Sequence, residues 1–184
     1  MAFFGVEIKH FRSHKYLRIR NKLFDLAEPK IIGIINCTPD SFFKDSRAIT
    51  SEEIERSVNK MIHEGVDIID IGACSTRPGA ELISEEEELN RVIPAITLIK
   101  EKFPELIISI DTFRAKVAEQ GLIAGADIIN DVTGGDFDPN IWTIAAKFKA
   151  PYILMHSRGN SKTMHDLSNY DHVSLEILLF LRNK

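Results

Sequence analysis

The sequence predicts an α/β fold in which parallel strands and helices alternate, and three observations lead to this prediction. Short apolar runs of strand length recur, and they are continuous rather than alternating with polar residues, which is typical of parallel strands buried on both faces. Amphipathic helical patterns lie between these runs. Polar residues follow each run directly. Repeated strand and helix order predicts right-handed βαβ units and a parallel sheet.

The strands are expected in the following order. Residues 16–26 alternate apolar and polar residues around Asn21 and Lys22, which predicts a β-hairpin, whereas no structure is predicted for residues 1–15. The core strands are predicted at the apolar runs 31–35, 66–71, 106–110, 127–132 and 152–155.

Capping signals predict the first two helices. Thr50 with Glu53, and Ser84 with Glu87, match the capping-box pattern ahead of apolar residues at helical spacing. Pro94 is expected to kink or restart the second helix, because proline lacks the backbone N–H that the helix needs.

The remaining helices are expected at 114–124, after Pro139 and at 173–182. Asp138 is predicted to cap the helix that has Pro139 as its first residue. Together the patterns predict about five βα units in a single domain spanning residues 1–184, with residues 1–15 as an unplaced extension.

Two folds accept five such units: a doubly wound open sheet, or part of a (β/α)8 TIM barrel. In an open sheet the ligand crevice lies at one switch point, whereas in a barrel many strand ends meet at one mouth. Every unit here ends in polar residues, so we favour the barrel. A complete barrel takes about 250 residues. The 184-residue chain is therefore expected to lack the last three units and to be inactive by itself.

Composition excludes several classes of function. The chain has 23 Lys and Arg against 27 Asp and Glu, a net charge of −4, and no block of basic residues, which argues against nucleic acid as a partner. It shows no signal-peptide core and no apolar run long enough to span a bilayer, so we expect no membrane association and a cytoplasmic location. Cys37 and Cys74 lack metal or redox spacing.

Chemistry is expected from the polar residues at the strand ends. Asn36 offers a hard oxygen ligand for Mg²⁺ shared with phosphate, or only shapes a turn. Asp111 is a ligand carboxylate or a helix cap, and Arg77 is an anion-binding guanidinium or a solvated loop residue. Asn130 and Asp131 together offer the donor and acceptor pattern of a pterin or purine edge.

The motifs at these strand ends resemble the dihydropteroate synthase family. They read "GIINCTPDSF", "GVDIIDIGACSTRPGA", "SIDTFRAKVAEQGLIAGADIINDVTGG" and "PYILMHSRGN", in family order over about residues 31–160. The resemblance implies a cytoplasmic, homodimeric transferase of folate biosynthesis that is a sulfonamide target. Such an enzyme uses Mg²⁺ to join dihydropterin pyrophosphate to 4-aminobenzoate through a C–N bond, and it releases pyrophosphate.

The same resemblance assigns roles to individual residues. It places Asn36 on Mg²⁺ and pyrophosphate, and Thr76 and Arg77 on the pyrophosphate and aminobenzoate side. The residues that it places at the pterin are Asp111, Asn130, Val132 and Met155. Asp111 and Arg77 are the expected catalytic residues, because the reaction mainly requires stabilisation of separating charges.

Departures from the family pattern leave some roles open. Lys44 stands where the family has an acid, with Asp45 one place later, and Ala73 and Cys74 replace Gly and Glu before the "STRPG" motif. Cys74 is interpreted as a small loop residue rather than a nucleophile, and His156 as a structural residue rather than a zinc ligand.

Two other functions compete with a synthase. A methyltetrahydrofolate-binding methyltransferase has a similar pterin barrel, but it has no pyrophosphate to bind and so does not account for "STRPG" or "NCTPDSF". The other is a non-catalytic pterin-binding fragment, which would bind pterin without releasing pyrophosphate.

Overall fold

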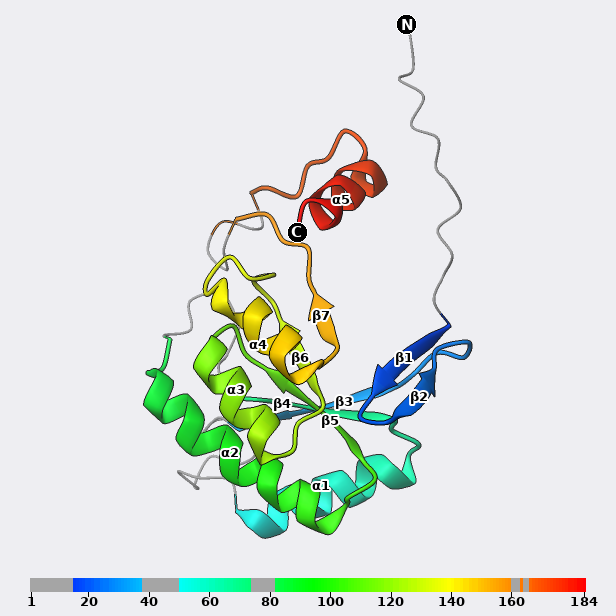
Figure 1. The fold of residues 1–184 in the computed structure, drawn as a ribbon, viewed down its shortest axis with the longest axis vertical. Coiled ribbons are helices and arrows are strands. Elements are labelled where there is room, and N and C mark those ends of the chain that lie inside the picture. The colour runs from blue at the N-terminus through cyan, green and yellow to red at the C-terminus, as the bar shows by residue number, and fades with distance from the viewer. Residues whose placement is uncertain (1–14, 38–49, 74–81, 160–162, 164–165) are drawn as a thin grey trace, which may run out of the picture.

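Strands and helices alternate along the whole described part of this computed structural model, which covers residues 15–37, 50–73, 82–159, 163 and 166–184. The elements are β1 Tyr16–Ile19, β2 Lys22–Asp25, β3 Ile32–Asn36, α1 Ser51–His63, β4 Ile68–Gly72, α2 Glu85–Lys102, β5 Ile107–Asp111, α3 Ala115–Ala124, β6 Ile128–Asp131, α4 Asn140–Phe148, β7 Tyr152–Leu154 and α5 Val173–Arg182 (Figure 1). Every predicted core strand and helix is therefore present in the predicted order.

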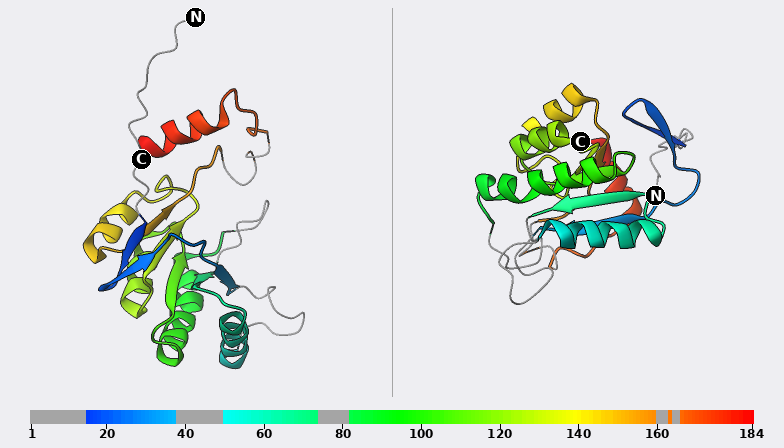
Figure 2. Two further views of the ribbon diagram at one scale, coloured as in Figure 1. Left: turned by 90° about the vertical axis from the view of Figure 1, so that its right-hand side faces the viewer. Right: turned by 90° about the horizontal axis from the view of Figure 1, so that it is seen from below.

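The sheet has the topology of a barrel segment. Strands β3 to β7 are all parallel and lie in sequential order, whereas a doubly wound sheet reverses its order at a switch point. Helices α1 to α4 cover one face only, where Ile35, Ile69 and Ile110 of the strands pack in one cluster with Val58 and Ile96 of the helices (Figures 1 and 2). The expected (β/α)8 barrel is confirmed for five of its units.

The β1–β2 hairpin lies at the opposite end of the sheet from the carboxyl ends of the strands. Ile19 is 3% exposed and packs in one cluster with Ile68 and Ile128, which are the first residues of their strands. Burying one such isoleucine side chain contributes about 1.5–3 kcal/mol. The hairpin therefore forms an apolar floor under the other face of the sheet, the face that the helices do not cover.

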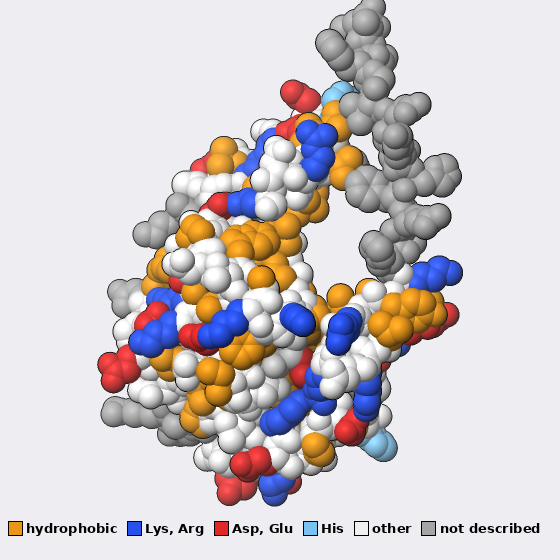
Figure 3. Space-filling model, viewed as in Figure 1, with side chains coloured by type: hydrophobic (Ala, Val, Ile, Leu, Met, Phe, Trp, Pro, Cys, Tyr) orange, Lys and Arg blue, Asp and Glu red, His pale blue; other side chains and the backbone are white. Residues whose placement is uncertain are grey.

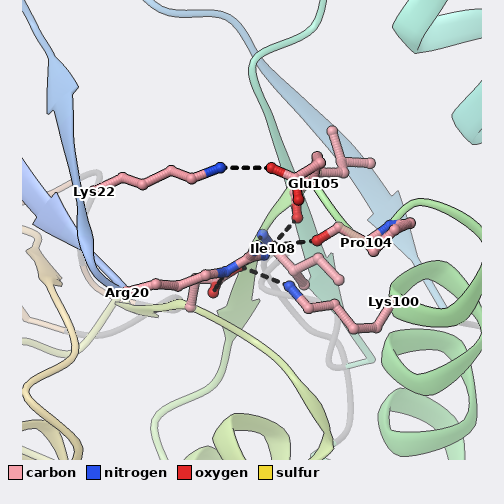
Figure 4. A network of polar contacts seen from close by, with 8 residues as sticks. Arg20, Lys22, Lys100, Pro104, Glu105 and Ile108 are labelled. Atoms are coloured by element: carbon pink, nitrogen blue, oxygen red, sulfur yellow. Dashed lines mark hydrogen bonds and ion pairs between the residues drawn. The ribbon is translucent and has the colours of Figure 1, made fainter.

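A polar network fixes the hairpin to the core sheet (Figure 4). Arg20 donates from Nε and Nη2 to the two carboxylate oxygens of Asp127, at 2.5 and 2.8 Å. The same guanidinium donates to the carbonyl oxygens of Pro104 and Leu106, each at 2.9 Å. Asp127 also accepts from the backbone N–H of Ile108 at 3.0 Å. The hairpin turn is thus tied to two strands of the core sheet.

Helix starts agree with the capping signals in part. Thr50 and Glu53 form the reciprocal capping box, and Ser84 accepts from the backbone N–H of Glu87. Helix α2 runs through Pro94 as one continuous helix, so the expected restart does not occur, because buried side chains on both sides of the proline hold the helix against the core.

Asp138 caps the start of α4, as predicted, and also accepts a hydrogen bond from the start of α3. Its carboxylate accepts from Asn140 N at 3.2 Å and from Ala115 N at 2.8 Å, so it serves the starts of α4 and α3 together. The sequence predicted Pro139 as the first residue of helix α4, but the helix begins one residue later, at Asn140.

The surface carries charges of both signs. On the face drawn in Figure 3, Lys and Arg side chains are interspersed with Asp and Glu side chains. No helix in the described residues is both long enough and apolar enough to cross a membrane.

On the uncovered face of β3, Ile32 and Ile34 are 42% and 59% exposed. The inner face of the sheet is therefore better covered at the hairpin than at the edge strand β3.

Candidate functional site

The carboxyl ends of the strands form one continuous row of register partners. Asn36 pairs with Gly72, Gly72 with Asp111, Asp111 with Asn130, and Asn130 with Ile153. Register partners on parallel strands point to the same face of a sheet. Because the residues next to them, such as Ile110 and Ile129, pack against the helices, this row faces the other side, the inside of the barrel segment. The structure thus brings Asn36, Asp111 and Asn130 to one edge.

Asp111 is a partly buried carboxyl group whose pKa is raised well above its ordinary value. Burial, followed by the charges of Asp70, Glu88 and Asp131, raises its pKa from 3.8 to about 7. Its side chain lies over Gly72, where an added Cβ would be 3.1 Å from Asp111 Oδ2. The glycine therefore provides the space that this carboxyl group occupies.

Asp111 is not the cap of the following helix. The backbone N–H of Arg114 donates to Thr112 Oγ1 at 3.2 Å, and the backbone N–H of Ala115 donates to Asp138. Thr112 in turn donates to the buried carboxylate of Glu88 at 2.6 Å, and the Arg114 guanidinium pairs with the same carboxylate. These contacts fix the loop after β5 and leave Asp111 at the strand-end row.

The side chain of Asn130 contacts a buried acid, Asp70, which lies in the neighbouring register row toward the amino-terminal ends of the strands. Asn130 Nδ2 donates to Asp70 Oδ2 at 3.0 Å, and Asp70 is 6% exposed. Burial raises the pKa of the Asp70 carboxyl, and the neighbouring Ser109 hydroxyl and Asn130 amide oppose that rise. Among the described residues, neither Asp70 Oδ1 nor Ser109 Oγ has a partner at hydrogen-bonding geometry. Two polar atoms are thus buried inside the barrel segment without a hydrogen bond at standard geometry, although the Ser109 hydroxyl is near enough to Asp70 to lower its pKa.

Asp131 does not share the site with Asn130, so the predicted pair is wrong. Successive strand residues point to opposite faces, and Asp131 lies on the helix side, fully buried. There it accepts from Tyr152 Oη at 2.5 Å, from Gly135 N at 2.8 Å, and from the backbone and hydroxyl of Thr133 at 2.7 and 2.8 Å. Asp131 shapes the loop after β6, and only Asn130 faces the site.

The residues that follow β6 and β7 lie at the same end of the sheet. Val132 is half-buried directly after β6, and Met155 is 37% exposed directly after β7. The two loops approach each other, since a Cβ added to Gly134 would lie 3.1 Å from the carbonyl oxygen of Met155. His156 packs edge-on against the Phe180 ring, with centroids 4.7 Å apart, consistent with a structural histidine.

Several predicted residues lie outside the described residues: Thr76 and Arg77, and also Lys44, Asp45 and Cys74. Asn36 is described and exposed at the end of β3. The described residues contain no group of three or more His, Cys, Asp or Glu side chains that could hold a metal ion. Asn36 offers such an ion one amide oxygen, a hard ligand of the kind that magnesium prefers.

Sequence reasoning missed Asp70 and Ser109. Both stand inside continuous apolar runs, "VDIIDI" and "LIISI", and they are register partners on β4 and β5. A polar residue in the middle of a fully buried strand is the signal that would have found them, because burying such a group without a partner is costly.

Chemically, the row can bind a flat, polar ligand along its edge. The Asn130 amide offers both a donor and an acceptor, and Asp111 can donate a hydrogen bond when protonated and accept one when ionised. Its pKa near 7 means that both forms are populated near neutral pH. The exposed Asn36 adds a hard oxygen atom at one end of the row. Fold and site together define a barrel protein with a polar binding site at the carboxyl ends of its strands.

Comparisons with known proteins identify the family. The family model described as pterin binding enzyme matches residues 32–184, so the chain belongs to the pterin-binding enzyme family. It is 46% identical over 155 residues to the dihydropteroate synthase of Synechocystis, an alignment that covers 84% of this chain and 53% of that protein.

Solved structures agree with this assignment. The Yersinia pestis dihydropteroate synthase in complex with a sulfonamide drug has a TM-score of 0.81 at 35% identity, covering 91% of this chain and 60% of that one. The Xanthomonas albilineans dihydropteroate synthase with 4-aminobenzoic acid has a TM-score of 0.77 at 37% identity, covering 92% and 59%. The chain thus spans roughly half to three fifths of the length of these relatives.

Proposed function

We propose that the protein acts in dihydropteroate synthesis, joining (7,8-dihydropterin-6-yl)methyl diphosphate to 4-aminobenzoate with release of pyrophosphate. One observation carries the proposal: Asn36, Asp111 and Asn130 lie in one register row inside a barrel segment that is 46% identical to a dihydropteroate synthase. The methyltransferase alternative is less well supported, since the named relatives are synthases.

The pterin lies against Asp111 and Asn130 in this proposal. Both side chains can match the alternating donors and acceptors of a pterin edge. As the C–O bond to pyrophosphate breaks, positive charge develops on the methylene carbon and spreads into the ring. A carboxylate at Asp111 stabilises that charge, and its pKa of about 7 lets it ionise in response to a cationic neighbour. The amine of 4-aminobenzoate then attacks the carbon and loses a proton.

The departing pyrophosphate lies at the other end of the row. Thr76 and Arg77, assigned here by their sequence motif, bind its oxygens, and the planar guanidinium can donate two parallel hydrogen bonds. Asn36 would hold Mg²⁺ together with the pyrophosphate. When bound, the ion neutralises negative charge that accumulates on the leaving group.

The proposal extends to the setting of the enzyme. Like the Yersinia pestis structure with its sulfonamide drug, the protein binds sulfonamides, at the aminobenzoate side. The protein works in the cytoplasm as a homodimer, as the family resemblance implies.

Ligand binding to the chain tests the proposal. We expect calorimetry to show binding of 6-hydroxymethylpterin pyrophosphate with Mg²⁺, and weaker binding of 6-hydroxymethylpterin alone. Arg77→Ala should weaken only the pyrophosphate-bearing ligand, by about 2–3 kcal/mol for lost charge-assisted hydrogen bonds. Arg56→Ala is the matched control, since Arg56 is exposed on α1.

Other outcomes would reject parts of the proposal. Equal losses for both ligands in Arg77→Ala would contradict the anion role. Preferential binding of methyltetrahydrofolate would favour the methyltransferase. Pterin binding without pyrophosphate release, in a sample that supplies aminobenzoate and Mg²⁺, would favour a protein that binds pterin without catalysis.

A further inference from the structure

Asp70 is an unusual residue for its place in the fold. It is 6% exposed in the middle of β4, on the inner face of the barrel segment, in a register row that also contains Ile34, Ser109 and Ile128. An apolar side chain would fill this position without desolvating a carboxyl group. Asp70 Oδ1 and the hydroxyl of its register partner Ser109 are also unsatisfied among the described residues. Packing alone does not account for an acid here.

The hydrogen bond from Asn130 indicates a role for Asp70. Asn130 Nδ2 donates a hydrogen bond to Asp70 Oδ2 at 3.0 Å, and a carboxyl oxygen that carries no proton can only accept. The amide must therefore turn its NH2 group toward Asp70. Asp70 lies one row nearer the hairpin floor than Asn130, which is paired with Asp111 at the strand ends. The amide oxygen Oδ1 consequently faces the open end, where a ligand would lie.

We propose that Asp70 is a positioning residue, which fixes the side-chain amide of Asn130 so that its oxygen is presented to the bound pterin. This inference rests on the proposed function for the identity of the ligand. Without Asp70 the Asn130 amide can rotate and present either its NH2 group or its oxygen. Fixing one orientation in advance removes the cost of ordering the side chain on binding.

A double-mutant cycle tests the coupling, with 6-hydroxymethylpterin as the probe. We expect Asp70→Ala and Asn130→Ala each to weaken its binding about tenfold, and the double variant to bind no more weakly than Asn130→Ala, because both changes remove the same oriented amide. Asp70→Asn, which is isosteric and still offers an oxygen to Asn130, should bind within about threefold of the parent. Unchanged affinity in Asp70→Ala, or additive losses of about a hundredfold, would overturn the proposal.

Nuclear magnetic resonance of the Asn130 NH2 group separates this inference from the proposed function. The signal is assigned by its loss in Asn130→Ala. We expect Asp70→Ala to shift it and to speed its hydrogen exchange, and Asp70→Asn to keep it near its original position. If the signal responds in this way but the parent chain binds no pterin, the proposed function fails and the positioning contact stands. If pterin binds but the signal ignores Asp70→Ala, the positioning role fails and the function stands.

Discussion

Replacing Asp111 with Asn should stabilise the protein, and by an amount that depends on pH. Burial and the charges of Asp70, Glu88 and Asp131 raise the pKa of Asp111 from 3.8 to about 7 in the folded chain. Between about pH 4 and pH 7 the folded state keeps a proton that the unfolded state has lost. The wild-type free energy of unfolding therefore falls as pH rises through this window, and the loss is complete above pH 7.

The structure sets the size of this effect. One pKa unit corresponds to about 1.4 kcal/mol, so the rise to about 7 sets an upper limit of about 4 kcal/mol at pH 8. Because the Asp111 side chain is partly exposed and solvent screens its neighbours, we expect about half of that, ~2 kcal/mol. The neutral amide of Asp111→Asn does not titrate. The variant should match the wild type near pH 4 and exceed its stability at pH 8.

Urea unfolding at pH 4.5, 6 and 8 measures this difference. With a slope of about 2 kcal/mol per molar urea, the midpoint of Asp111→Asn should lie about 1 M higher at pH 8. Asp138→Asn is the matched control of opposite sign. Hydrogen bonds from Ala115 and Asn140 to Asp138 outweigh its slight burial and lower its pKa, so its loss should destabilise the protein at pH 8 and matter less as pH falls below 4. A pH-independent difference for Asp111→Asn, or a less stable variant at pH 8, would refute the reasoning.

Two further substitutions test the floor and the helix side of the sheet. Arg20→Ala should cost about 2–3 kcal/mol in thermal unfolding, because it removes the main partner of the buried Asp127. Lys22→Ala, which removes only an exposed ion pair, should change stability by less than about 0.5 kcal/mol, and equal losses would contradict the anchor role. Tyr152→Phe should cost about 1–2 kcal/mol by removing one of the two hydrogen bonds that Asp131 Oδ2 accepts, without changing pterin affinity in a titration. A selective loss of pterin affinity would instead place Asp131 in the site.

Sequence patterns were sufficient for the fold because each pattern reports a strong local preference. Continuous Ile-rich runs and capping signals fixed the elements in order, and polar strand ends distinguished a barrel from an open sheet. The continuous α2 was not predictable from Pro94, since the local effect of proline is outweighed by buried side chains on both sides of it.

The site was predictable only where one residue carries the signal by itself. Asn36, Asp111 and Asn130 stand at strand ends, and their motifs identified them. The error at Asp131 arose because adjacent strand residues face opposite ways, so neighbours in sequence are not neighbours in a site. Asp70 was missed because its role comes from a contact across 60 residues, which no local pattern reports.

The Arg20 anchor also constrains the order in which the chain can fold during synthesis. Arg20 and Asp127 are 107 positions apart, and the carbonyls of Pro104 and Leu106 lie almost as far along the chain. The hairpin leaves the ribosome before β5 and β6, so it has no docking surface until those strands have emerged and paired. Ile19 stays uncovered for that interval, since its partners Ile68 and Ile128 must first be aligned. A segment made before these strands thus reaches its native place only after they have paired.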